Sequence, residues 1–414
     1  MTGKILSIAV GLATVSLMVS CSKKEATNPT GKLTGSITVA ASGGEGEITA
    51  LQSVADAFMT ANAGTTVKLD TVAGASELVG KLTADFVGGN APDLFVLNHR
   101  RLGGFAARGV IEAVTAVDTS GLYAKPLEAF RFDGKLVCLP SNASSMVVYY
   151  NTALFTNAGV QPPITGWTWD DMLAAAKALR AKGISAIGFE TALIRLAPFV
   201  WSNGGDFVDS TEKPTVVDLS SRAAREAIEF MLELQKTGQS ATDRAAQEPE
   251  EAFTAGRIAM YLDSRRAVPA FRKAEGLSFD VAPVPAKKSA VSVLHSDGYC
   301  VTEASTNKPL ARAFARFAVA GEGARVLADS GRAVPELRSI ASSPSFLAPD
   351  KAPKSAQVWL DQLENVKLLP HSPTWNEAEE FTEDVLTQLF AGKLTIDESI
   401  AQIAEGTKRE LAKQ

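Results

Sequence analysis

The sequence is poor in the residues that build small, cross-linked or metal-bound domains. Its 414 residues include only three cysteines and three histidines. Disulfide scaffolds and zinc modules need regularly spaced cysteine and histidine ligands, so neither class fits this chain. An excess of positive charge is also lacking, because 41 basic residues stand against 46 acidic ones and the net charge is −5. A mildly acidic chain has no electrostatic basis for binding nucleic acid, and we expect no such partner.

Signatures of cofactor binding and catalysis are missing as well. Gly44-Glu45-Gly46 lacks the third glycine of a dinucleotide loop, and no Gly-Lys-Ser/Thr phosphate loop occurs. The nucleophile elbow Gly-x-Ser-x-Gly and the metalloprotease motif His-Glu-x-x-His are absent too. Glu45 and Glu47 are weak candidates for a glycosidase pair, since alternate residues of a loop are not such an arrangement. We therefore expect no cofactor, no metal ion and no catalysis.

Long apolar runs are confined to the N-terminus. Lys4 precedes an apolar-to-neutral run from Ile5 to Val19. At about 1.5 Å per helical residue this run cannot cross a hydrocarbon core of about 30 Å. Residues 1–20 are therefore predicted to be a cleaved signal peptide. The ending Leu17-Met18-Val19-Ser20-Cys21 resembles a bacterial lipobox, in which the cysteine is lipidated; an unmodified Cys21 beside a plain cleavage site is the alternative.

The segment after Cys21 is predicted to be a tether. Residues 22–35 are mostly Ser, Lys, Thr, Asn, Pro and Gly, with almost no apolar side chain. Such a composition favours a flexible chain that holds a folded body away from a lipid surface. We expect residues 21–35 to be this lipid-anchored tether and the protein to be extracytoplasmic and membrane-attached. The lipid would be the only membrane contact.

Strand and helix patterns alternate in the first part of the remaining chain. Short apolar strands are predicted over 36–41, 66–72 and 93–97, with amphipathic helices over 48–59 and 77–87 between them. This alternation indicates an α/β fold with a mostly parallel sheet. Such sheets bind ligands beyond the carboxyl ends of their strands, where Glu45 and residues 98–101 fall.

A second unit is predicted to start near residue 140. Strands are expected over 135–139 and 146–150. Thr168 caps a helix in capping-box style, with Asp171 in the place of glutamate, and Gly183 ends it. Further helices are predicted from Ser220 to Gly238, after Asn307, and from Glu377 to Leu411 with a break at Gly392.

Five stretches, in consistent order, resemble the family 1 extracellular solute-binding proteins, to which maltose-binding protein belongs. These are the sugar-binding subunits of bacterial ABC importers. The resemblance spans roughly residues 36–411. The stretches are Pro92–Glu112, Leu139-Pro140 with Tyr149-Tyr150-Asn151, Gly166–Asp171, Ala252–Met260 and Ser305–Phe314.

The resemblance implies a type II periplasmic-binding-protein fold, in which two discontinuous α/β lobes are joined by a hinge. The N-terminal lobe would contain residues 36–140 and 302–345, and the C-terminal lobe 145–297 and 350–414. A monomer would bind a carbohydrate in the cleft, close, and dock on an ABC permease. A ligand shifts such an equilibrium only by binding the closed form more tightly.

Two other functions stay open. A receptor that presents its ligand to a membrane sensor would have the same sequence features. A surface-anchored carbohydrate-active enzyme would need two carboxylates about 5–10 Å apart across the cleft, one with a raised pKa.

The resemblance also suggests ligand-binding residues. Glu45 takes the place of a carboxylate that accepts hydrogen bonds from sugar hydroxyls, although it is equally compatible with a loop or capping role. Asn98, His99 and Arg100 lie at a loop tip, with a structural role for His99 as the alternative. Arg100 and Arg101 replace an acidic–basic pair of relatives, which favours an acidic or phosphorylated ligand unless both arginines are simply solvated.

Further positions come from the later motifs. Ser144 and Asp263 correspond to cleft-lining positions of relatives, and Asp297 and Tyr299 lie in a segment beside the second hinge crossing. A buried Asp297 would be a strong hydrogen-bond acceptor.

Tryptophans are the candidates for stacking against a sugar. Trp201 and Trp375 are expected near the cleft, with core packing as the alternative, and Trp167 and Trp169 are expected to be structural. Aromatic residues make up only 7% of the chain, which favours a mono- or disaccharide over a long oligosaccharide.

In the implied fold, Cys138 and Cys300 both lie next to hinge strands that are neighbours. Outside the cytoplasm they would form a disulfide if their Cα atoms lie within about 7 Å. Two isolated buried thiols are the alternative.

Overall fold

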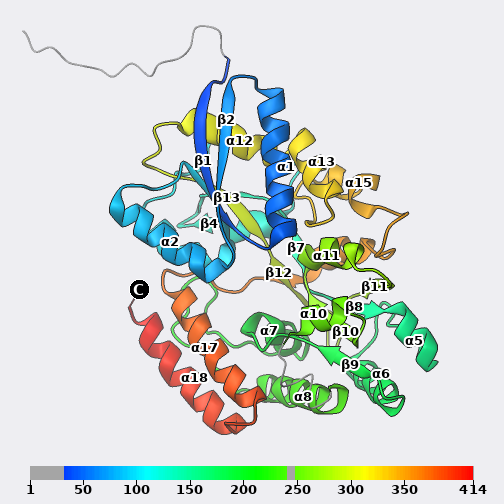
Figure 1. The fold of residues 1–414 in the computed structure, drawn as a ribbon. Helices are drawn as coiled ribbons and strands as arrows, with labels where there is room; N and C mark the ends of the chain where they lie inside the picture. The colour runs from blue at the N-terminus through cyan, green and yellow to red at the C-terminus, as the bar shows by residue number, and fades with distance from the viewer. Residues whose placement is uncertain (1–31, 240–247, 414) are drawn as a thin grey trace, which may run out of the picture.

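The structure is a computed structural model that describes residues 32–239 and 248–413. It has two lobes, one above the other in Figure 1, and each lobe has its own β-sheet with helices packed on it. The predicted α/β architecture with two lobes is confirmed. The predicted signal peptide and the candidate lipidation site Cys21 lie outside the described residues.

Five strands form the sheet of the N-terminal lobe: β1 (Gly35–Ser42), β2 (Thr65–Val72), β3 (Leu94–Asn98), β6 (Leu139–Pro140) and β13 (Asp297–Val301). Their order is β2-β1-β3-β13-β6. β1 pairs in parallel with β2 and β3, whereas β13 is antiparallel to β3 and β6. The three strands predicted early in the chain are therefore confirmed, and a late segment completes their sheet.

Helices cover both faces of this sheet because apolar side chains alternate along β1. Ile37, Val39 and Ala41 pack into one cluster, whereas Ala40, between Val39 and Ala41, belongs to a cluster on the other face. The first face carries α1 (Glu45–Ala61), α12 (Lys308–Val319) and α13 (Gly321–Asp329). The second face carries α2 (Ala75–Gly88), the 3₁₀ helix η1 (His99–Arg101), α3 (Gly103–Ala107) and α4 (Ala124–Ala129), near the small hairpin β4 (Arg131–Phe132) and β5 (Lys135–Leu136).

Four strands form the sheet of the C-terminal lobe: β8 (Val147–Asn151), β9 (Ser185–Gly188), β10 (Ile258–Asp263) and β11 (Phe279–Ala282). Their order is β11-β8-β10-β9, with β10 parallel to β9 and antiparallel to β8. The helices of this part are α5 (Thr152–Ala158), α6 (Trp169–Ala181), α7 (Leu193–Ser202), α8 (Arg222–Gly238), α10 (Pro249–Thr254), η2 (Arg265–Ala267) and α11 (Val268–Lys273).

The predicted helix signals hold with one correction. Thr168 Oγ1 accepts a hydrogen bond from Asp171 N, and the Asp171 carboxylate accepts one from Thr168 N, so the capping box forms with aspartate. The helix predicted from Ser220 begins one residue later than expected: Ser221 is its cap and accepts from Ala224 N at 3.2 Å. Either serine can cap, and only the course of the chain decides between them.

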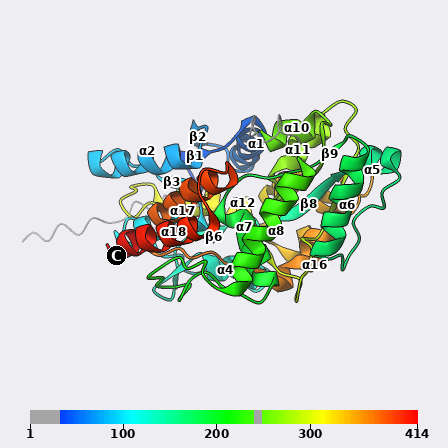
Figure 2. The same ribbon diagram turned by 90° about the horizontal axis from the view of Figure 1, so that it is seen from below.

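Two long helices near the end of the chain, α17 (Trp375–Phe390) and α18 (Ile396–Leu411), confirm the predicted helical segment and its break near Gly392. Seen from below, they lie beside α7 (Figure 2). Their apolar faces pack into the main core of the C-terminal lobe. The turn before α17 is pressed against the N-terminal lobe, since a Cβ on Gly103 would lie 2.1 Å from His371 O.

Short elements lie between α13 and α17. They are α14 (Arg338–Ala341), α15 (Pro344–Leu347), α16 (Gln357–Gln362), η3 (Leu363–Asn365) and β14 (Val366–Lys367). Val334 and Ile340 share a cluster with Tyr149 of β8. Packing thus places residues from about 334 onward beside the C-terminal lobe, and the predicted lobe boundaries stay predictions.

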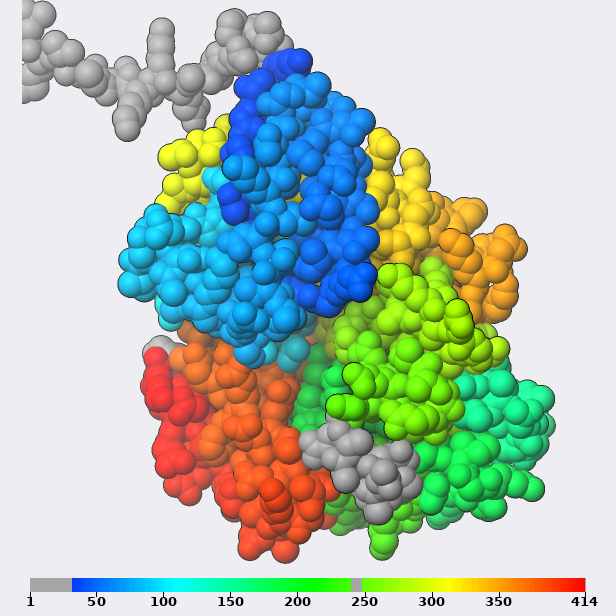
Figure 3. Space-filling view, viewed as in Figure 1, coloured from blue at the N-terminus to red at the C-terminus, as the bar shows by residue number. Residues whose placement is uncertain are grey.

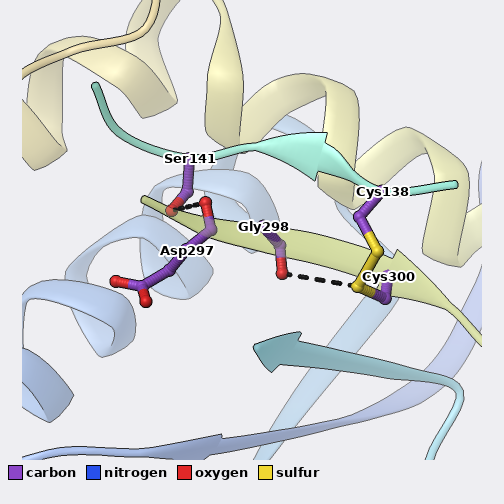
Figure 4. The surroundings of a disulfide bond; sticks show 5 residues. All are labelled: Cys138, Ser141, Asp297, Gly298 and Cys300. Atoms are coloured by element: carbon purple, nitrogen blue, oxygen red, sulfur yellow. Dashed lines mark hydrogen bonds between the residues drawn. A yellow bond between two sulfur atoms is a disulfide. The ribbon is translucent and has the colours of Figure 1, made fainter. Parts of the chain in front are cut away.

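Three chain segments cross between the two lobes. The third follows α13, near Val334, which accepts a hydrogen bond from Ala143 N. The other two are neighbours and form a ribbon. One segment leads from β6 to β7 (Ser144–Ser145), and the other from β12 (Ser292–His295) to β13. β6 pairs with β13, and β7 pairs with β12, which also pairs with β14. In the N-terminal lobe a disulfide joins Cys138 to Cys300, whose Cα atoms are 4.4 Å apart (Figure 4). Of the two alternatives for these cysteines, the structure therefore has the disulfide.

Within the described ranges 32–239 and 248–413, none of the helices combines the length and the apolar character needed to cross a bilayer.

Candidate functional site: the cleft between the lobes

A cavity of about 590 Å³ lies between the two lobes. Its walls come from the carboxyl ends of β1 and β3, the start of β13, the loop after β9 and the start of α7. The lobes touch at its front, where the start of α1 approaches Pro269 of α11 (Figure 3). Its charged or titratable lining residues are Glu47, Arg100, Arg101, Glu190, Arg195, Arg266, His295, Asp297, Arg332 and Glu383.

Five of the predicted ligand-binding residues line this cavity. They are Asn98, Arg100, Ser144, Asp297 and Tyr299. Tyr299 supplies the only phenylalanine, tyrosine or tryptophan ring in the lining formed by the described residues. The lining therefore mixes charged and apolar side chains, and Tyr299, which carries that ring, is 3% exposed.

Asp297 is the centre of a hydrogen-bonded network at the upper wall. Its carboxylate accepts from Asn98 Nδ2 at 3.0 Å and from Asn142 Nδ2 at 3.1 Å. Arg332 lies 3.3 Å from the same carboxylate and also pairs with Glu47. Figure 4 shows that Asp297 projects away from the disulfide while Ser141 binds its main-chain oxygen. The network fixes donors and acceptors from five chain segments at one wall.

Of the two glutamates at the start of α1, Glu47 lines the cavity and the predicted Glu45 does not. Glu45 is the first residue of α1; it is exposed and does not line the cavity. Glu47, two residues later, lines the cavity and is held there by Arg332. Arg332 lies 285 positions away along the chain, so no local signal distinguishes the two glutamates.

Arg100 and Arg101 are not solvated. The side chain of Arg100 is 15% exposed and pairs with Glu379 of α17, which is 3% exposed. Arg101 binds Asn376 and, at 3.2 Å, Glu380 of the same helix. These contacts link the loop after β3 to the C-terminal lobe.

Asp263 lies beneath the lower wall rather than in it. It is fully buried and accepts hydrogen bonds from Tyr261 Oη and Ser264 N. Arg195 approaches it to 3.0 Å and Arg266 to 2.6 Å. Burial by itself would raise the pKa of Asp263, but the two guanidinium groups outweigh burial and hold the pKa well below its usual range.

Three other predicted ligand residues lie in the protein interior. His99 is fully buried with Nδ1 3.3 Å from Ser296 O, and burial lowers its pKa to about 3, so the ring is neutral. Trp201 stacks on Phe207 at 5.4 Å, and Trp375 is fully buried at the start of α17. None of the three lines the cavity.

Trp167 and Trp169 are both buried, as expected of structural residues.

Several cavity residues were missed in the sequence. Arg195 had a usable signal, because it is the one charged residue in the otherwise apolar helix Leu193–Ser202. An arginine buried in such a helix needs a partner, and that requirement points to a polar site. Arg266, Arg332 and Glu383 had no comparable signal.

Glu383 makes the stability of the protein dependent on pH. Burial in the cleft, and next the charge of Glu379, raise its pKa from 4.5 to about 7. The folded protein therefore holds a proton here that the unfolded chain releases, so the free energy of unfolding falls as pH rises from about 4.5 to 7. We expect Glu383→Gln to be more stable than the wild type by about 1–2 kcal/mol at pH 8, with little difference at pH 4.

Chemical denaturation of both proteins at the two pH values measures this difference. Asp384→Asn changes the neighbouring, exposed carboxylate and is the matched control. If Asp384→Asn shows the same gain at pH 8, the effect is one of net charge and not of Glu383.

In the described part of the chain, no group of three or more His, Cys, Asp or Glu side chains is arranged to hold a metal ion.

The chain belongs to the bacterial extracellular solute-binding proteins, because residues 53–354 match that family. Proteins of this family bind solutes and are not enzymes. Their name places them outside the cytoplasm.

Two relatives with curated sequences are from Brucella abortus (strain 2308). One, a binding protein, is 24% identical over 358 residues, covering 83% of this chain and 85% of the relative. The sn-glycerol-3-phosphate-binding periplasmic protein UgpB is 26% identical over 170 residues, or 39% of this chain and 38% of UgpB.

Solved structures share the fold. The substrate-binding protein Lmo0181 from Listeria monocytogenes, in complex with cycloalternan, has a TM-score of 0.81 at 24% identity, covering 92% of this chain and 98% of that one. The GacH receptor of Streptomyces glaucescens, studied with acarbose, has a TM-score of 0.80 at 20% identity, covering 92% and 99%. Maltose-bound MalE3 of T. maritima has a TM-score of 0.79 at 19% identity, covering 90% and 99%.

Proposed function

We propose that this protein captures a small carbohydrate, a mono- or disaccharide, in the cleft and delivers it to an ABC permease without chemical change. The observation that carries the proposal is the cavity of about 590 Å³ between the lobes, lined by side chains from both. Its size is typical of small-molecule sites, which are about 300–1,000 Å³. Fixed amides, carboxylates and guanidinium groups such as those around Asp297 suit the closely spaced hydroxyls of a sugar.

The similar proteins agree with a carbohydrate ligand. The structures from Listeria, Streptomyces and Thermotoga are described with cycloalternan, acarbose and maltose. UgpB binds a phosphorylated polyol. The single ring of Tyr299 in the lining favours a short ligand over an oligosaccharide that needs several stacking platforms.

The proposal also covers how the protein is attached to the membrane and where it acts. Cys21 would carry the lipid, and the segment before β1 would hold a monomeric body beside the permease, outside the cytoplasm. A carbohydrate-active enzyme is less well supported. Glu383 has the raised pKa that a general acid needs, but the other lining carboxylates, Glu47, Glu190 and Asp297, are each paired with an arginine.

A thermal-shift screen of the mature chain against mono- and disaccharides tests the proposal. A ligand at 100 times its dissociation constant adds about 2.7 kcal/mol, which corresponds to a rise in Tm of about 4 °C or more. We expect such a shift with at least one sugar, recovered unaltered after incubation. A shift with amino acids or peptides alone would contradict the carbohydrate proposal, and a chemically changed sugar would contradict binding without turnover.

A further inference from the structure

The arginines that line the cleft fall into two groups. In the first group each arginine has its own carboxylate partner outside the lower wall: Arg100 pairs with Glu379, Arg101 with Glu380 and Arg332 with Glu47. Arg195 and Arg266 in the lower wall instead converge on one buried carboxylate, Asp263.

Arg195 is the most enclosed of these cations. Its side chain is 3% exposed, and Nη2 lies 3.0 Å from Asp263 and 2.8 Å from Glu190. Nη1 lies 3.3 Å from Nε2 of His295. Burial and then the Arg195 charge hold the pKa of His295 well below its usual value, so the ring is neutral and accepts at Nε2. The ring proton is then on Nδ1, and His295 is part of the cleft lining.

Glu190 differs from Asp263 in the way it is held. Asp263 is fully buried and has hydrogen bonds from Tyr261 and Ser264 besides its two arginines. Glu190 lies in the loop between β9 and α7, its side chain is 45% exposed, and it bridges Arg195 at 2.8 Å and Arg266 at 3.5 Å. Because the Glu190 side chain is about half exposed, its carboxylate can move into water when another carboxylate takes its place on the arginines.

We propose that the ligand is a sugar that carries a carboxylate, and that this carboxylate replaces the Glu190 carboxylate on Arg195 and Arg266 beside His295. The inference rests on the proposed function and narrows its substrate class. The Glu190 carboxylate already bridges the two guanidinium groups, with one oxygen near each, so the site accommodates a carboxylate in this position.

Charge balance favours an acidic sugar over a neutral one. If a ligand carboxylate replaces that of Glu190, the buried Arg195 keeps two carboxylate partners. A neutral sugar that displaced Glu190 would leave Arg195 with Asp263 alone. Glu383 also lines the cleft, and the charge of Arg195 acts on its carboxylate. Its pKa of about 7 leaves it partly protonated at neutral pH.

Calorimetric titration of the mature protein with matched pairs of sugars tests the inference. The pairs are neutral hexoses and disaccharides with the corresponding uronic acids, and glucose 6-phosphate is added to separate carboxylate from phosphate. We expect at least one uronic acid to bind about tenfold or more tightly than its neutral parent and than the phosphate. A neutral parent or a phosphate that binds equally well or better overturns the inference but leaves the proposed function intact. If no carbohydrate binds, the proposed function fails as well.

Two glutamates provide a matched pair of variants. Glu190→Gln removes the resident charge in the cleft, and Glu250→Gln removes a charge 2.9 Å from Arg266 that does not line the cleft. We expect Glu190→Gln to strengthen uronic-acid binding about threefold or more relative to the neutral parent, and Glu250→Gln to leave that ratio unchanged. If Glu190→Gln instead weakens both sugars equally, Glu190 is itself a ligand contact and the inference is wrong.

Discussion

Replacement of Arg100 by alanine should destabilise the protein by about 3–5 kcal/mol, because it leaves a buried carboxylate without its partner. Glu379 is only 3% exposed, and Arg100 is the ion-pair partner that the structure gives it. The charge cannot reach water without disturbing the packing of α17. Urea denaturation of the wild type and the variant at pH 7 measures the difference.

Arg101→Ala is the matched control for this prediction. Its partner Glu380 is 45% exposed and can be solvated when the arginine is removed, so the expected cost is about 1 kcal/mol. Adding Glu379→Gln to Arg100→Ala should restore part of the lost stability, since it removes the unpaired charge. Equal losses for Arg100→Ala and Arg101→Ala would show that burial of Glu379 does not determine the effect.

Removal of the disulfide should be the second large effect. Cys138 and Cys300 are separated by 162 positions, and a cross-link over so long a segment restricts the unfolded chain strongly. We expect the double variant Cys138→Ser/Cys300→Ser to be less stable by about 2–5 kcal/mol.

The same loss should follow from reduction of the wild type. Denaturation curves recorded with and without dithiothreitol are expected to differ for the wild type and to coincide for the double variant. Coincident curves for the wild type, together with two free thiols in the unfolded protein, would show that the disulfide does not form.

The fold was largely predictable because its signals are local. Alternation of apolar residues over 36–41 and 66–72, together with the capping box at Thr168, depends on near neighbours that can be read directly in the sequence. The site was only partly predictable. Asn98 falls within a stretch that resembles the family, and Asp297 beside the second hinge crossing that the resemblance implies, whereas the place of Glu47 depends on Arg332, which follows it by 285 positions.

The tryptophans show a different difficulty. Trp201 lies in a helix in which all ten residues are buried, so helical periodicity does not reveal which face meets the cleft. Arg195, on the same helix, reaches the cleft because Asp263 supplies a buried countercharge from β10. The directions in which the side chains of Trp201 and Arg195 point cannot be read from the helix sequence alone, because they depend on the residues that pack around the helix.

The paired crossing between the lobes limits how the protein can move. The two segments are hydrogen-bonded on both sides of the crossing, and Ser141 N also donates to Asp297 O at 2.7 Å within it. The disulfide holds them together at one end. Neighbouring strands tied in this way resist sliding along each other but bend together readily. Bending of this ribbon therefore favours a rocking rotation, which opens and shuts the cleft, over a sliding of one lobe past the other.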